Sequence, residues 1–418
     1  MLDRTLAPPF VKTTSFQLPP FTKTKLLNGV TLIHLDTIAQ ELVKIEIVFE
    51  AGKWFESKPE AAHFTIQMLD KGTKSKSSQQ IAELFDRYGA HIELSSNYDY
   101  ASVSLYTLSK HLAKLYPIFL ELITDPSFSN PELNQLKEHF IQGLKVKSEK
   151  TSYLASKLIR KKLFGPTHPY GQSVEEADVK EIQVSDLELH FQERMRPSHV
   201  FILGQISQSD LTILQNSLGE LNSNVIAEPA FSSSESEELA EHLEKVGSIQ
   251  TSIRLGKRTI QRDHPNYAGL LILNYYLGGY FGARLMKNLR EEKGLTYGIS
   301  ASINSFKNDC IILIGTDVNK ENRKLAVDEI FSEIKLLHSA LNEEELELAR
   351  RHFIGSLQSE TASPFSILGK VKNLELHNLP PDYYQNLISQ IDKVTPEELS
   401  AISQKHFEVD SFQLATVG

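Results

Sequence analysis

Two side chains in the second half of the sequence have the types and spacing to act on a substrate. The stretch LREEKGLTYGI, from Leu289, contains Arg290 and, seven positions later, Tyr297. A guanidinium and a phenol both donate hydrogen bonds, and fixed donors aimed at a developing negative charge in a dry site stabilise a transition state. The alternative is a chance pair, because Arg is favourable near a helix end and Tyr is common in strands.

The elements that would position this pair are a helix and a strand. The helix with Arg290 is expected to end at Lys293, because Gly294 suits a left-handed C-terminal cap. The chain should then enter a strand that carries Tyr297. The nearby glycines of LGGYFGARL (Gly278, Gly279 and Gly282) lack the Gly-Lys-Ser/Thr ending of a phosphate-binding loop, so we reject that interpretation.

The pattern around this segment occurs twice. LMKNLREEKGLTYGISASINSFKNDCIILIGT resembles IAELFDRYGAHIELSSNYDYASVSLYTL, and in each stretch a glycine, Gly294 or Gly89, stops the helix. NPELNQLKEHFIQGLKVKSEK is echoed by NEEELELARRHFIGSLQSETA, with His139 and His352 at equivalent places. In both cases the two copies are separated by close to half of the chain, which predicts a duplicated domain.

Each half contains strand patterns followed by runs of helices. In the first half the strand patterns are GVTLIHLD, VKIEIVFEAG, ASVSLYTL and HVFILGQI. We therefore predict an α+β fold made of two homologous α/β sandwich domains, with mainly antiparallel sheets flanked by helices. The Ser/Glu-rich stretch after Ile226 is the best linker candidate, which gives domains at 1–222 and 241–418 and a linker at 223–240.

Composition excludes several classes of function. The net charge of −9, with both signs mixed along the chain, argues against nucleic acid and anionic membranes as partners. The single cysteine, Cys310, excludes disulfides and a cysteine metal cage, and its apolar surroundings predict a buried strand residue. No signal-peptide pattern opens the sequence and no apolar run approaches the ~20 residues that span a bilayer, so we expect a cytoplasmic protein.

Two segments resemble a known family. AGKWFESKPEAAHFTIQMLDKGT is similar to a segment of the pitrilysin family of zinc peptidases, which includes insulinase and the mitochondrial processing peptidase. GGYFGARLMKNLREEKGLTYGISASI is similar to the signature of that family's second domain. The resemblance covers essentially the whole chain, duplication included. It implies that Arg290 and Tyr297 match the pair that holds the scissile carbonyl and its oxyanion.

The resemblance also locates the positions of a zinc site. In the family motif H-x-x-E-H, two His one helical turn apart bind zinc and the Glu activates a water molecule. Here His63 keeps the first place, but Ile66 replaces the Glu and Gln67 replaces the second His, while the distal ligand falls on Leu144. Isoleucine cannot transfer a proton, and leucine and a neutral amide are poor ligands. We therefore expect this chain to bind no metal and no other cofactor.

A rewired metal site is the alternative at this helix. Glu60 and His63 have the i, i+3 spacing of one helical face, and His91 and Asp99 could lie nearby in the fold. No second His at ligand spacing accompanies them, so we expect His63 to be a hydrogen-bonded residue on a packed helix.

Some bacterial members of the family divide the two signatures between subunits. The resemblance therefore predicts the non-zinc subunit of a heterodimeric peptidase, inactive alone, which closes a chamber over an oligopeptide or unfolded polypeptide substrate. Its partner would be a paralogous chain with an intact H-x-x-E-H motif and the zinc. The alternative is a catalytically inactive peptide-binding or structural protein, similar to the core subunits of respiratory complexes, with a homodimer as the alternative assembly.

Overall fold

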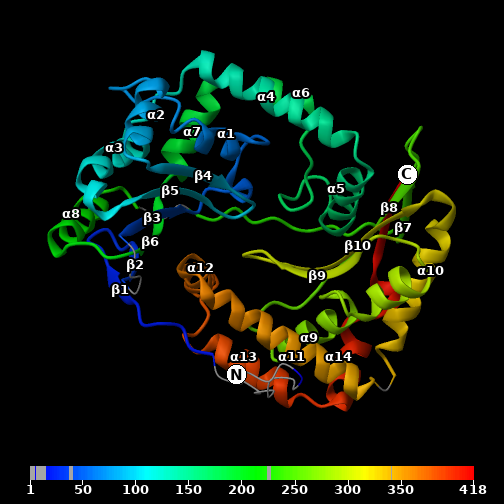
Figure 1. Cartoon of the computed structure of the whole chain (residues 1–418). Coiled ribbons are helices and arrows are strands. Elements are labelled where there is room, and N and C mark those ends of the chain that lie inside the picture. Colours follow the sequence, from blue (N-terminus) through cyan, green and yellow to red (C-terminus); the bar gives the residue numbers. More distant parts are fainter. Residues whose placement is uncertain (1–4, 6–15, 37–40, 224–226, 340) are drawn as a thin grey trace. The chain divides into compact units, whose positions relative to one another are not determined.

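The computed structural model describes residues 5, 16–36, 41–223, 227–339 and 341–418. The described chain divides into two compact units (Figure 1). The N-terminal unit spans Pro19–Lys245, and the C-terminal unit contains Val246–Thr416 together with residues 16–18. Each unit contains a sheet flanked by helices, as the sequence predicts.

The N-terminal unit is built on one mainly antiparallel sheet. Its strands are β1 (Thr22–Lys25), β2 (Thr31–Leu35), β3 (Leu42–Phe49), β4 (His91–Ser96), β5 (Ala101–Leu108) and β6 (Pro197–Leu203). The strand order is β1-β2-β6-β3-β5-β4, and the β2–β6 pair is parallel. The helices are η1 (Lys53–Phe55), α1 (Ala61–Gln67), α2 (Ser78–Arg87), η2 (Ser109–His111), α3 (Leu112–Thr124), α4 (Asn130–Ser148), α5 (Thr151–Phe164), α6 (Glu176–Glu181), α7 (Val184–Arg194) and α8 (Gln208–Gly219).

The second sheet has five strands among the described residues. They are β7 (Ala240–Leu243), β8 (Gln250–Arg258), β9 (Ile299–Ser305), β10 (Cys310–Asn319) and β11 (Gln413–Val417), in the order β7-β11-β8-β10-β9. The helical elements are α9 (Tyr267–Gly278), η3 (Met286–Glu292), η4 (Lys320–Asn322), α10 (Arg323–Leu336), α11 (Glu343–Ser359), η5 (Glu360–Ala362), α12 (Pro364–Leu376), α13 (Tyr383–Lys393), α14 (Pro396–His406) and η6 (Val409–Ser411). Helix α9 packs against α11, α13 and α14 (Figure 1).

The two sheets repeat one topology. The order β2-β6-β3-β5-β4 in the first sheet corresponds to the order β7-β11-β8-β10-β9 in the second sheet. Each strand occupies the same position in its sheet as its counterpart. The counterparts β4 and β9 are separated along the chain by close to half of its length, and so are β5 and β10. The predicted fold class, two homologous sandwich domains with mainly antiparallel sheets, is confirmed. Cys310 is fully buried at the start of β10, as predicted.

The two glycines that were expected to stop helices have the backbone conformation that this role requires. Gly89 has φ +60° after α2, and Gly294 has φ +61° after η3. Left-handed φ values are unfavourable for other residues, which explains why the helical pattern ends at these two points. None of the described helices has the length and apolarity needed to cross a bilayer.

Part of the predicted linker is docked on the N-terminal unit. Residues 227–239 form no helix or strand, and 224–226 lie outside the described residues. The indole Nε1 of Trp54 donates to the Pro229 carbonyl at 3.0 Å, and Phe231 packs edge-on against the Trp54 ring. The buried Lys162 ammonium donates to the carbonyl of Glu238 at 2.5 Å. The domain boundaries at 222 and 241 stay predictions.

Candidate functional site

Helix α1 contains His63, Ile66 and Gln67, the segment that resembles a zinc-binding motif. It packs against α7 and against the edge strand β4. Its start is fixed by acidic residues: Glu60 at the N-cap has φ +69° and forms an ion pair with Lys53, and a Glu56 carboxylate oxygen accepts the backbone N–H of Ala62 at 3.2 Å. Desolvation, followed by the charge of Glu60, raises the pKa of Glu56 to about 8.

His63 is held by rings rather than by a hydrogen bond. Its imidazole lies 5.3 Å from the Phe64 ring and 5.1 Å from the Phe140 ring. Among the described residues it has no hydrogen-bond partner, so the expectation of a hydrogen-bonded His63 is wrong. Burial lowers the pKa of the imidazole, which keeps it neutral at physiological pH.

The other three positions of the zinc motif are closed by packing or by hydrogen bonding. Ile66 is fully buried in the core of the N-terminal unit, and Leu144 on α4 is 8% exposed. The Gln67 amide donates to the Leu94 carbonyl of β4 at 3.1 Å, which fixes it against the sheet edge. The residues present therefore do not fit a catalytic zinc ion.

The residues of the alternative metal site, His91 and Asp99, make other interactions instead. Asp99 accepts the hydroxyl of Tyr170 at 2.5 Å, and His91 is exposed on β4 with its ring 6.0 Å from that of Tyr106. Within the described part of the chain, no three His, Cys, Asp or Glu side chains are grouped so that they could hold a metal ion.

Arg290 lies in η3, which is a π-helix. Its guanidinium lies 4.8 Å from the centre of the Phe281 ring, and Phe281 is itself 61% exposed. In the described residues Arg290 has no carboxylate partner, so its positive charge stays available. π-Helices are rare, and they are frequently found at functional sites.

Polar contacts with α10 hold η3 in place. The Asn288 amide donates to Glu333 at 2.8 Å and to Glu329 at 3.0 Å. Lys293 forms an ion pair with Glu329 at 2.6 Å, and Arg284, just before η3, forms one with Glu333 at 2.7 Å. These three polar side chains near Arg290 in sequence are therefore bonded to α10. The Arg290 guanidinium itself lies over the Phe281 ring.

Tyr297 lies in a bend just before β9, which begins at Ile299, so the predicted strand position is wrong by this short distance. Its side chain is 91% exposed. The backbone beneath it is fixed: the Thr296 hydroxyl donates to the Asp317 carbonyl at 2.9 Å, and the Thr316 hydroxyl donates to the Gly298 carbonyl at 2.9 Å. A rigid turn therefore presents a fully accessible phenol.

Comparison with known sequences decides the family. Residues 33–174 match the sequence profile of insulinase (peptidase family M16), and residues 181–353 match that of the peptidase M16 inactive domain. The chain belongs to peptidase family M16. The resemblance inferred from the two sequence signatures is thus confirmed.

Relatives and solved structures support this membership over the whole length of the M16 chain. It is 23% identical to an uncharacterized zinc protease, YmxG, of Bacillus subtilis, with 92% of this chain and 95% of the relative covered. It is 24% identical to a protein named non-peptidase homolog YmxG of Helicobacter pylori, covering 89% of this chain and 88% of the relative. The fold matches an M16 inactive-domain protein of Pseudomonas fluorescens with TM-score 0.86 and 25% identity, over 96% of this chain and 98% of that one.

Two features of the M16 site were missed by sequence reasoning. Phe281, the ring beneath Arg290, lies in the glycine-rich part of the second-domain signature, but no role was predicted for it, although an aromatic residue between glycines was the available signal. Glu56 was part of the quoted signature, yet no local pattern could indicate that burial would raise its pKa.

Proposed function

We propose that this M16 chain is the non-zinc subunit of a heterodimeric peptidase. Arg290 and Tyr297 donate hydrogen bonds to the scissile carbonyl oxygen of a peptide, in a site whose zinc is bound by a paralogous partner with an intact H-x-x-E-H motif. The observation that carries the proposal is a contrast within the chain. The zinc positions are closed, with Ile66 fully buried, whereas the Tyr297 phenol is 91% exposed on a rigid turn.

The chemistry of the pair suits this role. The exposed phenol offers its O–H, and a guanidinium with no carboxylate partner in the described chain offers several N–H groups. The Phe281 ring orients the Arg290 guanidinium without using a hydrogen-bond donor, since it contacts the cation through its face. Both donors are therefore free to meet an oxyanion that forms only during the reaction.

An oligopeptide is the substrate class that we propose. β4 is the edge strand of the N-terminal sheet, and a sheet edge presents backbone N–H and C=O groups to which an extended peptide can add. Helix α1, on which the zinc motif of an active relative would lie, packs against this strand.

Reconstitution with the partner tests the proposal. We expect the chain to form a complex with an H-x-x-E-H paralogue from the same genome, and peptide hydrolysis to appear that neither chain shows alone. Tyr297→Phe and Arg290→Ala should leave assembly and peptide binding intact but lower kcat by roughly 10²–10³, or roughly 3–4 kcal/mol each. Tyr153→Phe on α5 and Arg351→Ala on α11 are matched controls and should change kcat less than about twofold.

The second candidate function is that of a catalytically inactive peptide-binding or structural protein, with a homodimer as the alternative assembly. The burial of Ile66 and Leu144 at zinc-motif positions supports this function as much as the first candidate function. One relative is named a non-peptidase homolog. Unchanged turnover in assembled complexes of the Tyr297 and Arg290 variants would reject the donor role and leave this second function.

A further inference from the structure

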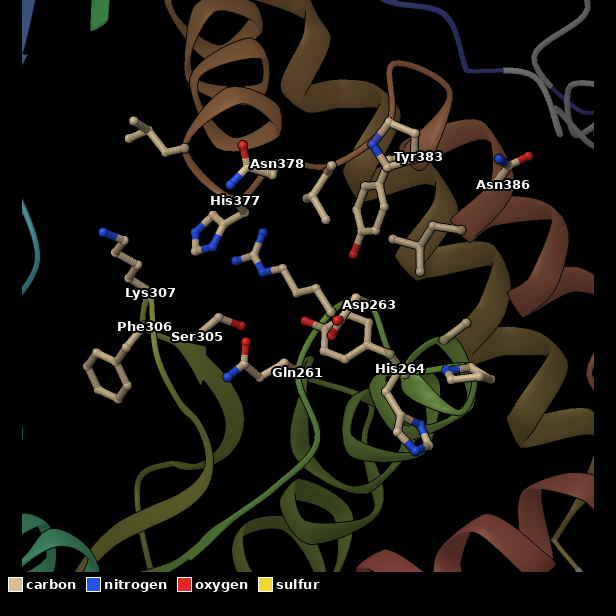
Figure 2. Close-up of a pocket in the computed structure, with 18 of the residues that line it drawn as sticks. Gln261, Asp263, His264, Ser305, Phe306, Lys307, His377, Asn378, Tyr383 and Asn386 are labelled. Atoms are coloured by element: carbon tan, nitrogen blue, oxygen red, sulfur yellow. The ribbon is translucent and has the colours of Figure 1, made fainter. Parts of the chain in front are cut away.

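A second site lies in the C-terminal unit, in a cavity of about 660 Å³ (Figure 2). Three segments line it: the loop after β8 from Gln261 to Ala268, the β9–β10 turn from Ser305 to Asp309, and residues from the end of α12 and from α13. Its volume falls within the range of roughly 300–1,000 Å³ that is typical of small-molecule sites.

Arg262 is the charged residue whose bonding is incomplete in this cavity. Its Nη1 donates to the Asn373 side-chain oxygen at 2.6 Å, and the Asn373 amide donates to the Tyr384 hydroxyl at 2.9 Å, so the guanidinium is fixed on one side. Its Nε is buried without a hydrogen-bond partner. Within the described ranges no carboxylate pairs with Arg262. A buried donor without an acceptor costs free energy, and an acceptor on a bound ligand would remove this cost.

Several of the polar side chains that line the cavity around Arg262 are neutral. The Tyr383 hydroxyl points into the cavity (Figure 2), and burial raises the pKa of this phenol, so it keeps its proton. Burial, and then the charge of Arg262, lowers the pKa of His377 to about 4, so this imidazole is uncharged at neutral pH. Asn378 and Gln261 add amide groups to the wall. Neither the Tyr383 ring nor the His377 ring carries a negative charge that would compete with a bound anion for Arg262.

The charges that line the cavity favour a single negative charge on the ligand. Asp309 is neutralised by Arg258, at 2.7 Å. Arg262, which has no carboxylate partner among the described residues, presents a single positive charge to a ligand. A carboxylate balances this single positive charge, whereas a phosphate dianion would leave an excess negative charge in the cavity. The two oxygens of a carboxylate also match two N–H groups on one side of the planar guanidinium.

We propose that this cavity binds a small organic monocarboxylate with an apolar body. The free side of the Arg262 guanidinium holds the carboxylate and the Tyr383 hydroxyl donates to it. The body of the ligand contacts the apolar wall, which is formed by Leu376, Leu379, Pro380 and Leu387. A free carboxylic acid and the C-terminus of a short peptide share this chemistry, and the site is separate from the proposed peptidase function.

Calorimetric titration of the full chain tests this proposal with two pairs of probes. The first pair is 3-phenylpropionate and its amide, and the second is the dipeptide Ala-Phe and its C-terminal amide. We expect at least one of the two acids to bind and its amide to bind at least tenfold more weakly, because the amide has no charge for Arg262. Binding of phenylpropionate alone identifies a free acid as the ligand, and preferential binding of Ala-Phe identifies a peptide C-terminus.

Variants then assign the binding to this cavity. Arg262→Gln should weaken the acid at least tenfold, Arg262→Lys should also weaken it because the planar fork is lost, and Tyr383→Phe should weaken it several-fold. Arg351→Gln, at a 47% exposed side chain on α11, is the control and should change affinity less than about twofold. If Arg262→Gln fails to fold, Tyr383→Phe decides. Absence of binding by both acids, equal binding of acid and amide, or unchanged affinity in the folded cavity variants would overturn the proposal.

Discussion

At the scale of single residues, the chain has lost the metal-binding side chains of the family's zinc motif at Ile66, Gln67 and Leu144. The loss could be predicted from the sequence, because the ability to bind a metal is a property of residue type, and Ile66 and Leu144 lack any donor atom. The exposure of Tyr297 and the environment of His63 could not, because they depend on which distant residues pack nearby. Phe140, which contacts the His63 ring, belongs to α4, and two strands and two α-helices separate it from α1 along the chain.

The zinc positions yield the first prediction. The wild-type chain should hold no stoichiometric zinc by metal analysis after removal of chelators. Ile66→Glu with Gln67→His should not restore full peptidase activity, since Leu144 still lacks a carboxylate, and Leu144→Glu is the required third change. Val146→Glu, at a 63% exposed position on the same helix, is the matched control for this third change and should add no zinc affinity. Strong proteolysis by the double variant would show that the third ligand is not at Leu144.

Glu56 yields a prediction about pH. Its pKa rises from 4.5 to about 8 on folding, because desolvation and the Glu60 charge disfavour the ionised form. The folded chain thus binds this proton more tightly than the unfolded chain. The resulting stabilisation is fully present below about pH 4.5 and is lost as the pH rises to about 8.

Urea unfolding at about pH 5.5 and about pH 8.5 measures this effect. The difference in unfolding free energy between the two pH values should be smaller in Glu56→Gln than in the wild type, because the amide does not titrate. Glu83→Gln, at an exposed position on α2, should keep the wild-type difference. Identical pH dependence in wild type and Glu56→Gln would show that Glu56 is ionised in the folded chain.

At the scale of elements, the sequence predicted strands better than the irregular helix. ASVSLYTL coincides with β5, because its opening alternation of apolar and polar residues specifies a strand locally. The π-helical form of η3 was not predicted, since its geometry depends on the contacts of Asn288 and Lys293 with α10. Tyr297 was placed on a strand that begins only after it, and the Thr296 and Thr316 hydrogen bonds explain the bend.

Gly278, the last residue of α9, has a packing role that is open to test. A Cβ on Gly278 would lie 2.8 Å from the backbone nitrogen of Ala301 in β9, closer than side chains approach backbone. Gly278→Ala should therefore lower the free energy of unfolding by about 1–3 kcal/mol in urea denaturation. Gly355→Ala, inside α11 with nothing within 4 Å of the new Cβ, should be neutral or stabilising by up to about 1 kcal/mol. Equal stability of the two variants would exclude close packing as the reason for Gly278.

At the scale of the whole molecule, the duplication was the most predictable feature. Echoed helices and glycines, separated by close to half of the chain, indicate it in the sequence, and the matched strand orders confirm it. The exact division of the chain into units was harder to predict from the sequence. Residues 16–18 belong to the C-terminal unit, although they precede the N-terminal unit in the sequence. The side chain of Gln385 accepts the backbone N–H of Phe16 at 2.6 Å, a contact between segments that no local pattern relates.

The proposed heterodimer has a stoichiometry that can be measured. Mixed with its H-x-x-E-H paralogue, the 47.2 kDa chain should form a one-to-one complex in sedimentation equilibrium, and this complex should form in preference to a homodimer. Tyr297→Phe should not change the association, because the hydroxyl is proposed to act on substrate. A stable homodimer that excludes the paralogue would favour the structural alternative.

The strand order has a consequence for how the chain acquires its fold during synthesis. β6 (Pro197–Leu203) lies between β2 and β3, which leave the ribosome long before it. Until β6 emerges, both of those strands expose an open edge that can pair with other chains. The second sheet repeats this delay, because β11 (Gln413–Val417) lies between β7 and β8. Each half of a nascent chain therefore passes through a long aggregation-prone interval, during which chaperones that shield strand edges should bind it.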